Sequence, residues 1–464
     1  MTSDTHRPAT ALLAADIADA DLPSLADTVR HVRTRGTPTV RDVLARSVED
    51  QVVAIQPRCG VGGHTEMLEL LRALDTGAQP DILTVTIDSH TRLGRFEEAA
   101  RLAATDPAAL NGYPLVAHGW RRGREFVESV SVPVEIRHGS PDARQLFRVA
   151  MAAGATSFEG GGISYNLPYC KDVPLAESLA HWREVDATTG DLERAGLMVD
   201  REFFGSLTGV LTPPSISLAI GIIEAALAAA EGVTCLSVSY PQGGNVAQDV
   251  AALRAIPELA RRYLPTGVEV YPVLHEFMGV FPVRRAHAEQ LIFYGALTAR
   301  LGGAAKLVTK THQEALGIPD AQANIDGMRL AAVANSPLLD FITVDVERVE
   351  EELAWLLDEV DDLVAPVVGA ADPARAVVAA FADGTLDVPF SASRHARGDV
   401  LPCRDASGAV RYAVTGALPL SDAALKRHRD GLGLANGAHS MRTLVERITR
   451  DINHFPRLFG ESVL

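Results

Sequence analysis

Three arginines that lie far apart in the sequence each close a short run of apolar residues. Arg58 follows the segment Val52–Gln56, Arg92 ends the run TVTIDSHTR, and Arg137 ends the run VPVEIR. A guanidinium group pairs with a carboxylate through two parallel hydrogen bonds and stays charged when it is buried. If the three side chains meet, they repel one another and require an anion, and a dicarboxylate supplies two charges. The alternative is that each arginine forms a local ion pair at the surface.

Glu159 is followed by three glycines, and Tyr165 and Tyr169 come shortly after it. Glycines allow the backbone to approach a ligand closely. Beside an arginine cluster, the Glu159 carboxylate could hold a substrate ammonium, act as a base, or neutralise an arginine. The two tyrosines either donate hydrogen bonds to a carboxylate or serve as packing. Lys310 and Glu314, four residues apart, follow a later apolar segment.

Composition and missing motifs exclude several classes of function. Acidic residues outnumber basic ones, and the net charge of −16 argues against nucleic acid as a partner. The sequence has no HExxH, GxSxG or Walker motif. Its four cysteines are far apart, so no metal site is expected and a reducing cytoplasm is the expected location. The start MTSDTHRPAT lacks a secretory signal pattern, and the apolar segment 217–230 is too short to cross a membrane.

Short apolar runs that alternate with segments of helical periodicity predict a parallel sheet with helical crossovers. Eight such strands close a (β/α)8 TIM-type barrel, whereas an open, doubly wound sheet is the competing interpretation. We favour the barrel because the notable polar residues follow the carboxyl ends of strands. The predicted strands are Val52–Gln56, Ile82–Ile87, Pro114–Ala117, Val132–Arg137, Thr156–Glu159, Cys235–Ser239, Val268–Leu274 and Lys306–Lys310.

We divide the α/β chain into three parts. Residues 1–48 form an N-terminal helical arm, 49–345 the catalytic barrel, and 346–464 an α+β extension. The extension is predicted to begin with an acidic helix, Val346–Leu363, and to contain a strand at Arg411–Thr415. A helical stretch over about 421–454 follows.

Several long runs, in the same order, resemble the large, epsilon subunit of glutamate mutase, also called methylaspartate mutase. The resemblance covers roughly residues 50 to 420. The matching runs are IQPR (55–58), TVTIDSHTR (84–92), RHGSPDAR (137–144), EGGGISYNLPY (159–169), LTGVLTPPSIS (207–217), GNVAQDVAALR (244–254), HEFMGVFP (275–282), KTHQEALGIPDAQAN (310–324) and DVPF (387–390).

The resemblance implies a (β/α)8 barrel and assigns a role to each matching residue. Glu159 would hold and deprotonate the substrate ammonium. The substrate carboxylates would be bound by Arg58, Arg92, Arg137, Tyr165 and Tyr169. Lys310 and Glu314 would hold the adenosyl ribose of the cofactor. The residues expected near the corrin ring are Asn111, Pro168 and Met278.

The implied activity is a radical rearrangement that interconverts L-glutamate and (2S,3S)-3-methylaspartate with adenosylcobalamin. This chain lacks the cobalamin-ligating pattern DxHxxG, because the glycine after Asp88 and His90 comes one place late, at Gly94. The cofactor would therefore be shared with a small cobalamin-binding subunit. The resemblance implies a homodimer of this chain within a heterotetramer.

Four departures from the family pattern bear on the substrate: Phe158, Phe277, Val280 and His312-Gln313. They leave open a related cobalamin mutase that acts on a different amino diacid. A barrel without catalysis, which binds an amino diacid or a partner, is the alternative from another class. A barrel lyase would require a metal cluster or a Schiff-base lysine, and the sequence has no metal-ligand spacing.

Overall fold

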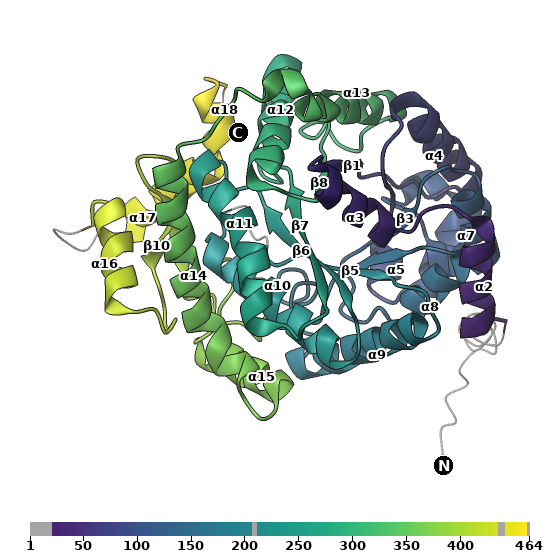
Figure 1. The fold of residues 1–464 in the computed structure, drawn as a ribbon, viewed down its shortest axis with the longest axis horizontal. Coiled ribbons are helices and arrows are strands. Elements are labelled where there is room, and N and C mark those ends of the chain that lie inside the picture. Colours follow the sequence, from purple (N-terminus) through teal and green to yellow (C-terminus); the bar gives the residue numbers. More distant parts are fainter. Residues whose placement is uncertain (1–20, 207–210, 435–440, 462–464) are drawn as a thin grey trace, which may run out of the picture.

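The computed structural model describes residues 21–206, 211–434 and 441–461. Eight parallel strands form one curved sheet in the order β1-β8-β7-β6-β5-β4-β3-β2, surrounded by helices (Figure 1). The ends of that order, β1 and β2, are joined by backbone bonds from Asp81 N to Ile55 O and from Thr86 N to Cys59 O. The sheet is therefore a (β/α)8 barrel, as predicted. The strands are β1 (Ala54–Gln56), β2 (Leu83–Thr86), β3 (Val134–Arg137), β4 (Ser157–Glu159), β5 (Asp200–Phe203), β6 (Cys235–Pro241), β7 (Glu269–His275) and β8 (Lys306–Val308).

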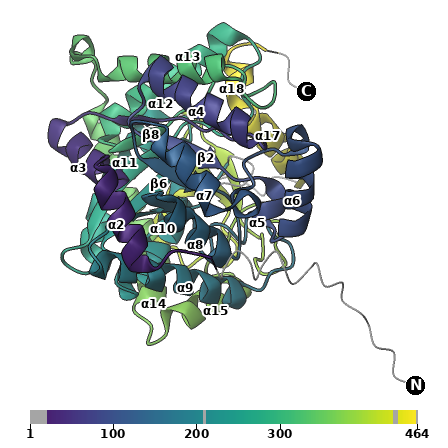
Figure 2. The ribbon, with the colours of Figure 1, turned by 90° about the vertical axis from the view of Figure 1, so that its right-hand side faces the viewer.

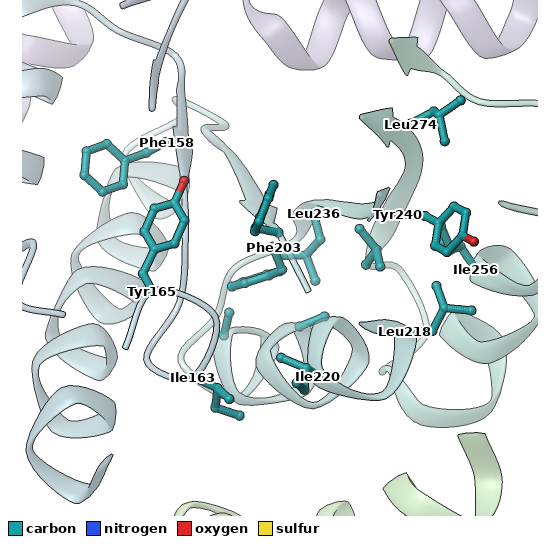
Figure 3. Packing of buried hydrophobic residues seen from close by; sticks show 14 of the residues in the cluster. Phe158, Ile163, Tyr165, Phe203, Leu218, Ile220, Leu236, Tyr240, Ile256 and Leu274 are labelled. Carbon is teal, nitrogen blue, oxygen red and sulfur yellow. The ribbon is translucent and has the colours of Figure 1, made fainter. Parts of the chain in front are cut away.

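Helices follow the strands and cover the outside of the barrel. They are α4 (His64–Ala78), α5 (Ser89–Arg92), α6 (Phe96–Thr105), α7 (Leu115–Glu128), α8 (Arg144–Ala153), α9 (Leu175–Arg194), α10 (Pro214–Ala230), α11 (Val246–Tyr263), α12 (Arg285–Gly302) and α13 (Ala321–Ala332). Short 3-10 turns lie at Pro107–Ala109, Val333–Asn335 and Pro337–Leu339. The apolar core fills the space between strands and helices, where Phe203 and Leu236 from the sheet pack near Ile220 of α10 (Figure 3).

The N-terminal arm closes the bottom of the barrel. It contains α2 (Leu25–Arg35) and α3 (Val40–Asp50), and each begins with a side-chain cap, Ser24 for α2 and Thr39 for α3. Val40 and Leu44 of α3 are fully buried against residues at the amino ends of the strands. Both helices lie together on the outside of the molecule (Figure 2). The arm therefore stabilises the end of the barrel opposite the carboxyl ends of the strands.

The C-terminal extension packs on the helix layer over α10 and α11. Its first helix, α14 (Val346–Val368), buries an apolar stripe and also two carboxylates. Glu352 pairs with Arg411 of β10, and Glu359 pairs with Arg427 of α16. The extension further contains α15 (Pro373–Asp383), the antiparallel pair β9 (Leu401–Arg404) and β10 (Val410–Val414), α16 (Asp422–Gly431), α17 (Met441–Ile452) and α18 (His454–Leu458).

The structure corrects one predicted strand. The segment Pro114–Ala117 is the start of α7, in which Leu115 and Val116 are buried against the core. A short apolar run alone does not distinguish a strand from a buried helical turn. The true fifth strand is β5, which the sequence analysis missed because three of its four residues, Asp200–Glu202, are charged. Because one strand was predicted wrongly and one was missed, the predicted number of eight strands is still correct.

Parts of other predictions fall outside the described residues. These are the first twenty residues of the arm, residues 207–210 of the run LTGVLTPPSIS, and residues 435–440 of the final helical stretch. The domain limits stay predictions: residue 48 lies within α3, and Asp345 caps α14. Among the described helices, none combines the length and apolar character needed to cross a membrane.

Candidate active site

Arg137, Glu159 and Tyr165 form a buried contact at the carboxyl end of β3 and β4. Arg137 is the last residue of β3, and its Nη2 lies 2.8 Å from Oε1 of Glu159. Glu159 ends β4 and is completely buried. Its other carboxylate oxygen accepts a hydrogen bond from the Tyr165 hydroxyl. Three side chains that the sequence analysis singled out separately are thus in direct contact.

Burial raises the pKa of Glu159 to about 7. Arg137 opposes this effect, and the nearby Glu202 carboxylate adds to it. A carboxyl group with such a pKa changes its charge near neutral pH, which suits a group that binds a cation or exchanges a proton.

Arg58 and Arg92 lie on the same side of the barrel as Arg137. Tyr169 is 47% exposed, but its phenol lies close to all three arginines: desolvation and the Glu159 charge raise the pKa of Tyr169, whereas the charges of Arg58, Arg137 and Arg92 lower it. Within the described chain, Nε of Arg58, Nε of Arg92 and Nη1 of Arg137 are buried without a hydrogen-bond partner. Buried guanidinium N–H groups without acceptors are costly, so the cluster is suited to an anion.

Short-range structure explains how Arg92 reaches the cluster. Asp88 caps the one-turn helix α5 by accepting hydrogen bonds from His90 N and Thr91 N. Arg92 ends this helix, and its side chain passes over Gly139 in the loop after β3. The cap therefore positions an arginine that is not itself in a strand.

Lys310 and Glu314 form an ion pair after β8. Lys310 is only 3% exposed, and burial together with Arg58 lowers its pKa to about 8. Its backbone N–H donates to Oε2 of Glu276, 2.6 Å away, which fixes the segment against the end of β7. This pair therefore lies within electrostatic reach of the arginine cluster.

The three residues expected near a corrin ring lie in loops after β2, β4 and β7. Asn111 is exposed, and its side chain accepts a hydrogen bond from Ser89 N. Pro168 and Met278 are half-buried. Their place in loops after strands is compatible with the rim of the barrel, but they have no direct contact with the charged cluster among the interactions of the described residues.

A layer of buried charge lies beneath the arginines, and the sequence analysis missed most of it. Lys306 Nζ donates to Oε2 of Glu135 and to Oε2 of Glu202, both at 2.5 Å. His275 Nε2 lies 2.7 Å from Oε1 of Glu202, and burial together with Arg137 lowers the pKa of His275 to about 3. Glu202 was missed along with its strand, because three consecutive charged residues give no strand signal.

The ligand atoms of Glu159, Glu202 and His275 are close enough together to hold a metal ion. Arg137 and Lys306 already donate to these carboxylates and supply the positive charge that such a group requires. We therefore interpret this group of side chains as part of a layer of ion pairs in the barrel interior that supports Arg137.

Two departures from the family pattern point away from this cluster. Ser157 and Glu159 face the barrel interior, so Phe158 between them faces outward, where it packs on Phe147 and His138. Phe277 belongs to a separate apolar cluster and packs edge-on against Phe455. Neither side chain contacts an arginine of the cluster.

Comparison with known proteins agrees with this arrangement. The sequence profile of the family described as methylaspartate mutase E chain matches residues 37–449. The glutamate mutase epsilon subunit of Halobacterium salinarum is 44% identical, over 82% of this chain and 81% of that protein. The proteins of the same name from Desulfitobacterium hafniense and Escherichia coli O157:H7 are 42% and 40% identical, over 83% and 86% of this chain and 82% and 84% of those proteins. Because both the profile and the relatives span most of its length, this chain belongs to the methylaspartate mutase E chain family.

Proposed function

We propose that this chain is the catalytic subunit of an adenosylcobalamin-dependent glutamate mutase. It is an isomerase that interconverts L-glutamate and (2S,3S)-3-methylaspartate. The proposal rests on one observation above all: Arg137, which with nearby Arg58 and Arg92 has an unpaired guanidinium nitrogen, contacts the buried Glu159 carboxylate, whose pKa is raised to about 7. A substrate with two carboxylates and one ammonium group offers the opposite charges to the arginines and to Glu159.

In this arrangement, Arg58, Arg92 and Arg137 bind the substrate carboxylates, and Glu159 holds the ammonium group. Tyr165 fixes the Glu159 carboxylate, and Tyr169 lies beside the arginines at the edge of the cluster. Because the fragments of a rearranging carbon skeleton must not separate, firm two-pronged binding favours recombination over loss. Phe158 and Phe277 pack outside the cluster, so these two of the four departures do not alter the groups that would meet the substrate.

Residues of this chain also fit the binding of adenosylcobalamin. Lys310 and Glu314 offer a buried donor and a carboxylate acceptor for the two ribose hydroxyls of the adenosyl group. Asn111, Pro168 and Met278 are the residues of this chain that would meet the corrin ring. When bound, adenosylcobalamin supplies the radical chemistry, while the protein orients the substrate and excludes water.

The name "epsilon subunit" of the relatives implies a further subunit in those enzymes. We extend this to the present chain: its partner is a small subunit that carries DxHxxG and binds cobalamin. Two copies of each chain would form a heterotetramer in the cytoplasm.

The direct test is reconstitution. The purified chain is mixed with its small subunit, adenosylcobalamin and L-glutamate, and 3-methylaspartate is measured by NMR. Product formation supports the proposal. Turnover of another amino diacid alone would indicate a related mutase, and binding of a diacid without turnover of any would indicate a barrel without catalysis.

The arginine clamp leads to a prediction for Arg92→Lys. We expect kcat/KM for L-glutamate to fall by about 10²-fold with an unchanged melting temperature, because lysine keeps the charge but lacks the planar fork. Arg95→Lys is the matched control, since Arg95 is exposed three residues away. Full activity of Arg92→Lys would contradict the clamp.

A second prediction concerns pH. Glu159 binds the ammonium group only when it is ionised, and its pKa is about 7 in the free protein. We expect kcat/KM to fall by about tenfold for each pH unit below this pKa. The residual activity of Glu159→Gln should lack this acid limb. A wild-type profile that stays flat from about pH 8 to about pH 5.5 would argue against this role.

A further inference from the structure

A cavity of about 690 Å³ lies outside the barrel, between α9, α10 and α15. In Figures 1 and 2, α9 and α15 lie side by side. The cavity is lined mainly by apolar side chains, among them Leu179, Phe203, Ile223 and Val378. Its volume is typical of sites that bind small molecules.

Two buried polar atoms in the wall of this cavity have no partner within the described chain. Glu224 of α10 is 3% exposed, and its Oε1 accepts hydrogen bonds from Ile163 N at 2.7 Å and Ser164 N at 2.8 Å. Among the described residues, its Oε2 has no partner of hydrogen-bonding geometry, although the Ser164 side chain lies near enough to lower the pKa of Glu224. Nε1 of Trp182, in α9, is likewise buried and unpaired. An unpaired buried polar group is unfavourable, so a ligand that satisfies both atoms is favoured.

We propose that this cavity is a second binding site, which takes a small neutral molecule with an apolar body and one hydroxyl or amide group. Such a group can accept from the Trp182 N–H and can either donate to Glu224 or accept from it. Burial raises the pKa of Glu224 to about 7, so both protonation states are accessible. Of the acidic residues in the wall, Asp186 pairs with Arg201 and Glu231 pairs with Arg183, so a charged ligand would have to compete with existing ion pairs.

The loop after Glu159 lies between this site and the arginine cluster, since Gly161 and Gly162 of the loop line the cavity. A Cβ atom at Gly161 would lie 2.3 Å from Oε1 of Glu224, so the loop after Glu159 rests directly on this carboxylate. Tyr165, which donates to Glu159, follows in the same loop. A molecule bound to Glu224 is thus in contact with the wall of the proposed active site without entering it.

The first test uses benzyl alcohol as the probe and the full chain as the receptor. We expect saturable 1:1 binding, measured by ligand-observed NMR and calorimetry. Ala180 is an exposed residue of α9 that lines the cavity, so Ala180→Trp is expected to weaken binding at least about tenfold by filling it. Glu177→Trp, at an exposed position of α9 outside the lining, is the matched control and should bind normally.

The second test isolates the polar contact. In Glu224→Met, benzyl alcohol should bind about tenfold more weakly, whereas its isostere ethylbenzene should bind at least as tightly as to the wild type. Absence of saturable binding to the wild-type chain, or equal binding by wild type and Ala180→Trp, would overturn the proposal. Equal weakening of both probes by Glu224→Met would overturn its polar part. Because no cobalamin or partner subunit is needed, failure here is independent of the mutase assignment.

Discussion

Glu159→Gln is expected to lower kcat/KM of the reconstituted mutase for L-glutamate by about 10²- to 10⁴-fold. Glutamine keeps the size of the side chain and can still accept the Tyr165 hydrogen bond, but it carries no charge for the ammonium group. The raised pKa of Glu159 means that its ionised form costs stability at neutral pH, so removal of the charge should not unfold the protein. The measurement combines steady-state kinetics with thermal unfolding of the same sample.

A graded series distinguishes charge from packing. Tyr165→Phe removes the hydroxyl that donates to Glu159 and should lower kcat/KM by about tenfold, since it loosens the carboxylate without removing it. Glu177→Gln alters an exposed glutamate on α9 and should leave activity unchanged. Comparable losses in Glu177→Gln and Glu159→Gln, or wild-type kinetics in Glu159→Gln, would show that the buried charge has no special role.

The barrel was predictable because most of its strands are apolar and its helices periodic. The exception is β5, where Asp200, Arg201 and Glu202 are all buried. Asp200 and Glu202 face the polar interior of the barrel, while Arg201 faces α9 and pairs with Asp186. A strand with charge on both faces lacks the hydrophobic pattern on which sequence analysis depends.

The arginine cluster was predictable for a different reason. In a closed parallel barrel, all strands end at the same rim, so a charged residue after any strand is near a charged residue after the others. The side chains beneath the rim are those that face the barrel interior. Which residues of each strand face the interior is determined by the pairing register between neighbouring strands. Lys306 fell inside a predicted strand, yet its partners Glu135 and Glu202 come from strands that are not its neighbours in the sheet.

This buried layer gives the arginines their rigidity. Arg137 Nη1 lies 3.9 Å from Glu135, and its Nη2 is 3.5 Å from His275 Nδ1, which itself contacts Glu202. Lys306 joins the two glutamates. The guanidinium end of Arg137, which we propose binds the substrate, is therefore supported by a network of fixed charges rather than by apolar packing alone.

Lys306→Met is expected to lower the free energy of unfolding by about 3–5 kcal/mol at about pH 9, because Glu135 is ionised above its pKa of about 8 and the change leaves it and Glu202, both fully buried, without their cation. Urea denaturation measures the loss, and Lys426→Met, at an exposed lysine paired with Asp430, should change stability by less than about 1 kcal/mol. The loss in the free energy of unfolding caused by Lys306→Met should become smaller as the pH falls. The pKa of Glu135 is already about 8 through burial and the Glu202 charge, and without Lys306 it rises further, so protonation removes the uncompensated charge.

The same argument predicts rescue by a second change. The double variant Lys306→Met/Glu135→Gln removes one buried positive charge and one buried negative charge together. Glu202 keeps its hydrogen bonds to His275 and Ser239. We expect the double variant to be more stable than Lys306→Met alone, although Glu135→Gln by itself should stabilise little, since Lys306 already compensates the carboxylate there. Such non-additivity is the signature of direct coupling between two groups. If the two changes were additive in the free energy of unfolding, the network would be a set of independent side chains and could not position Arg137.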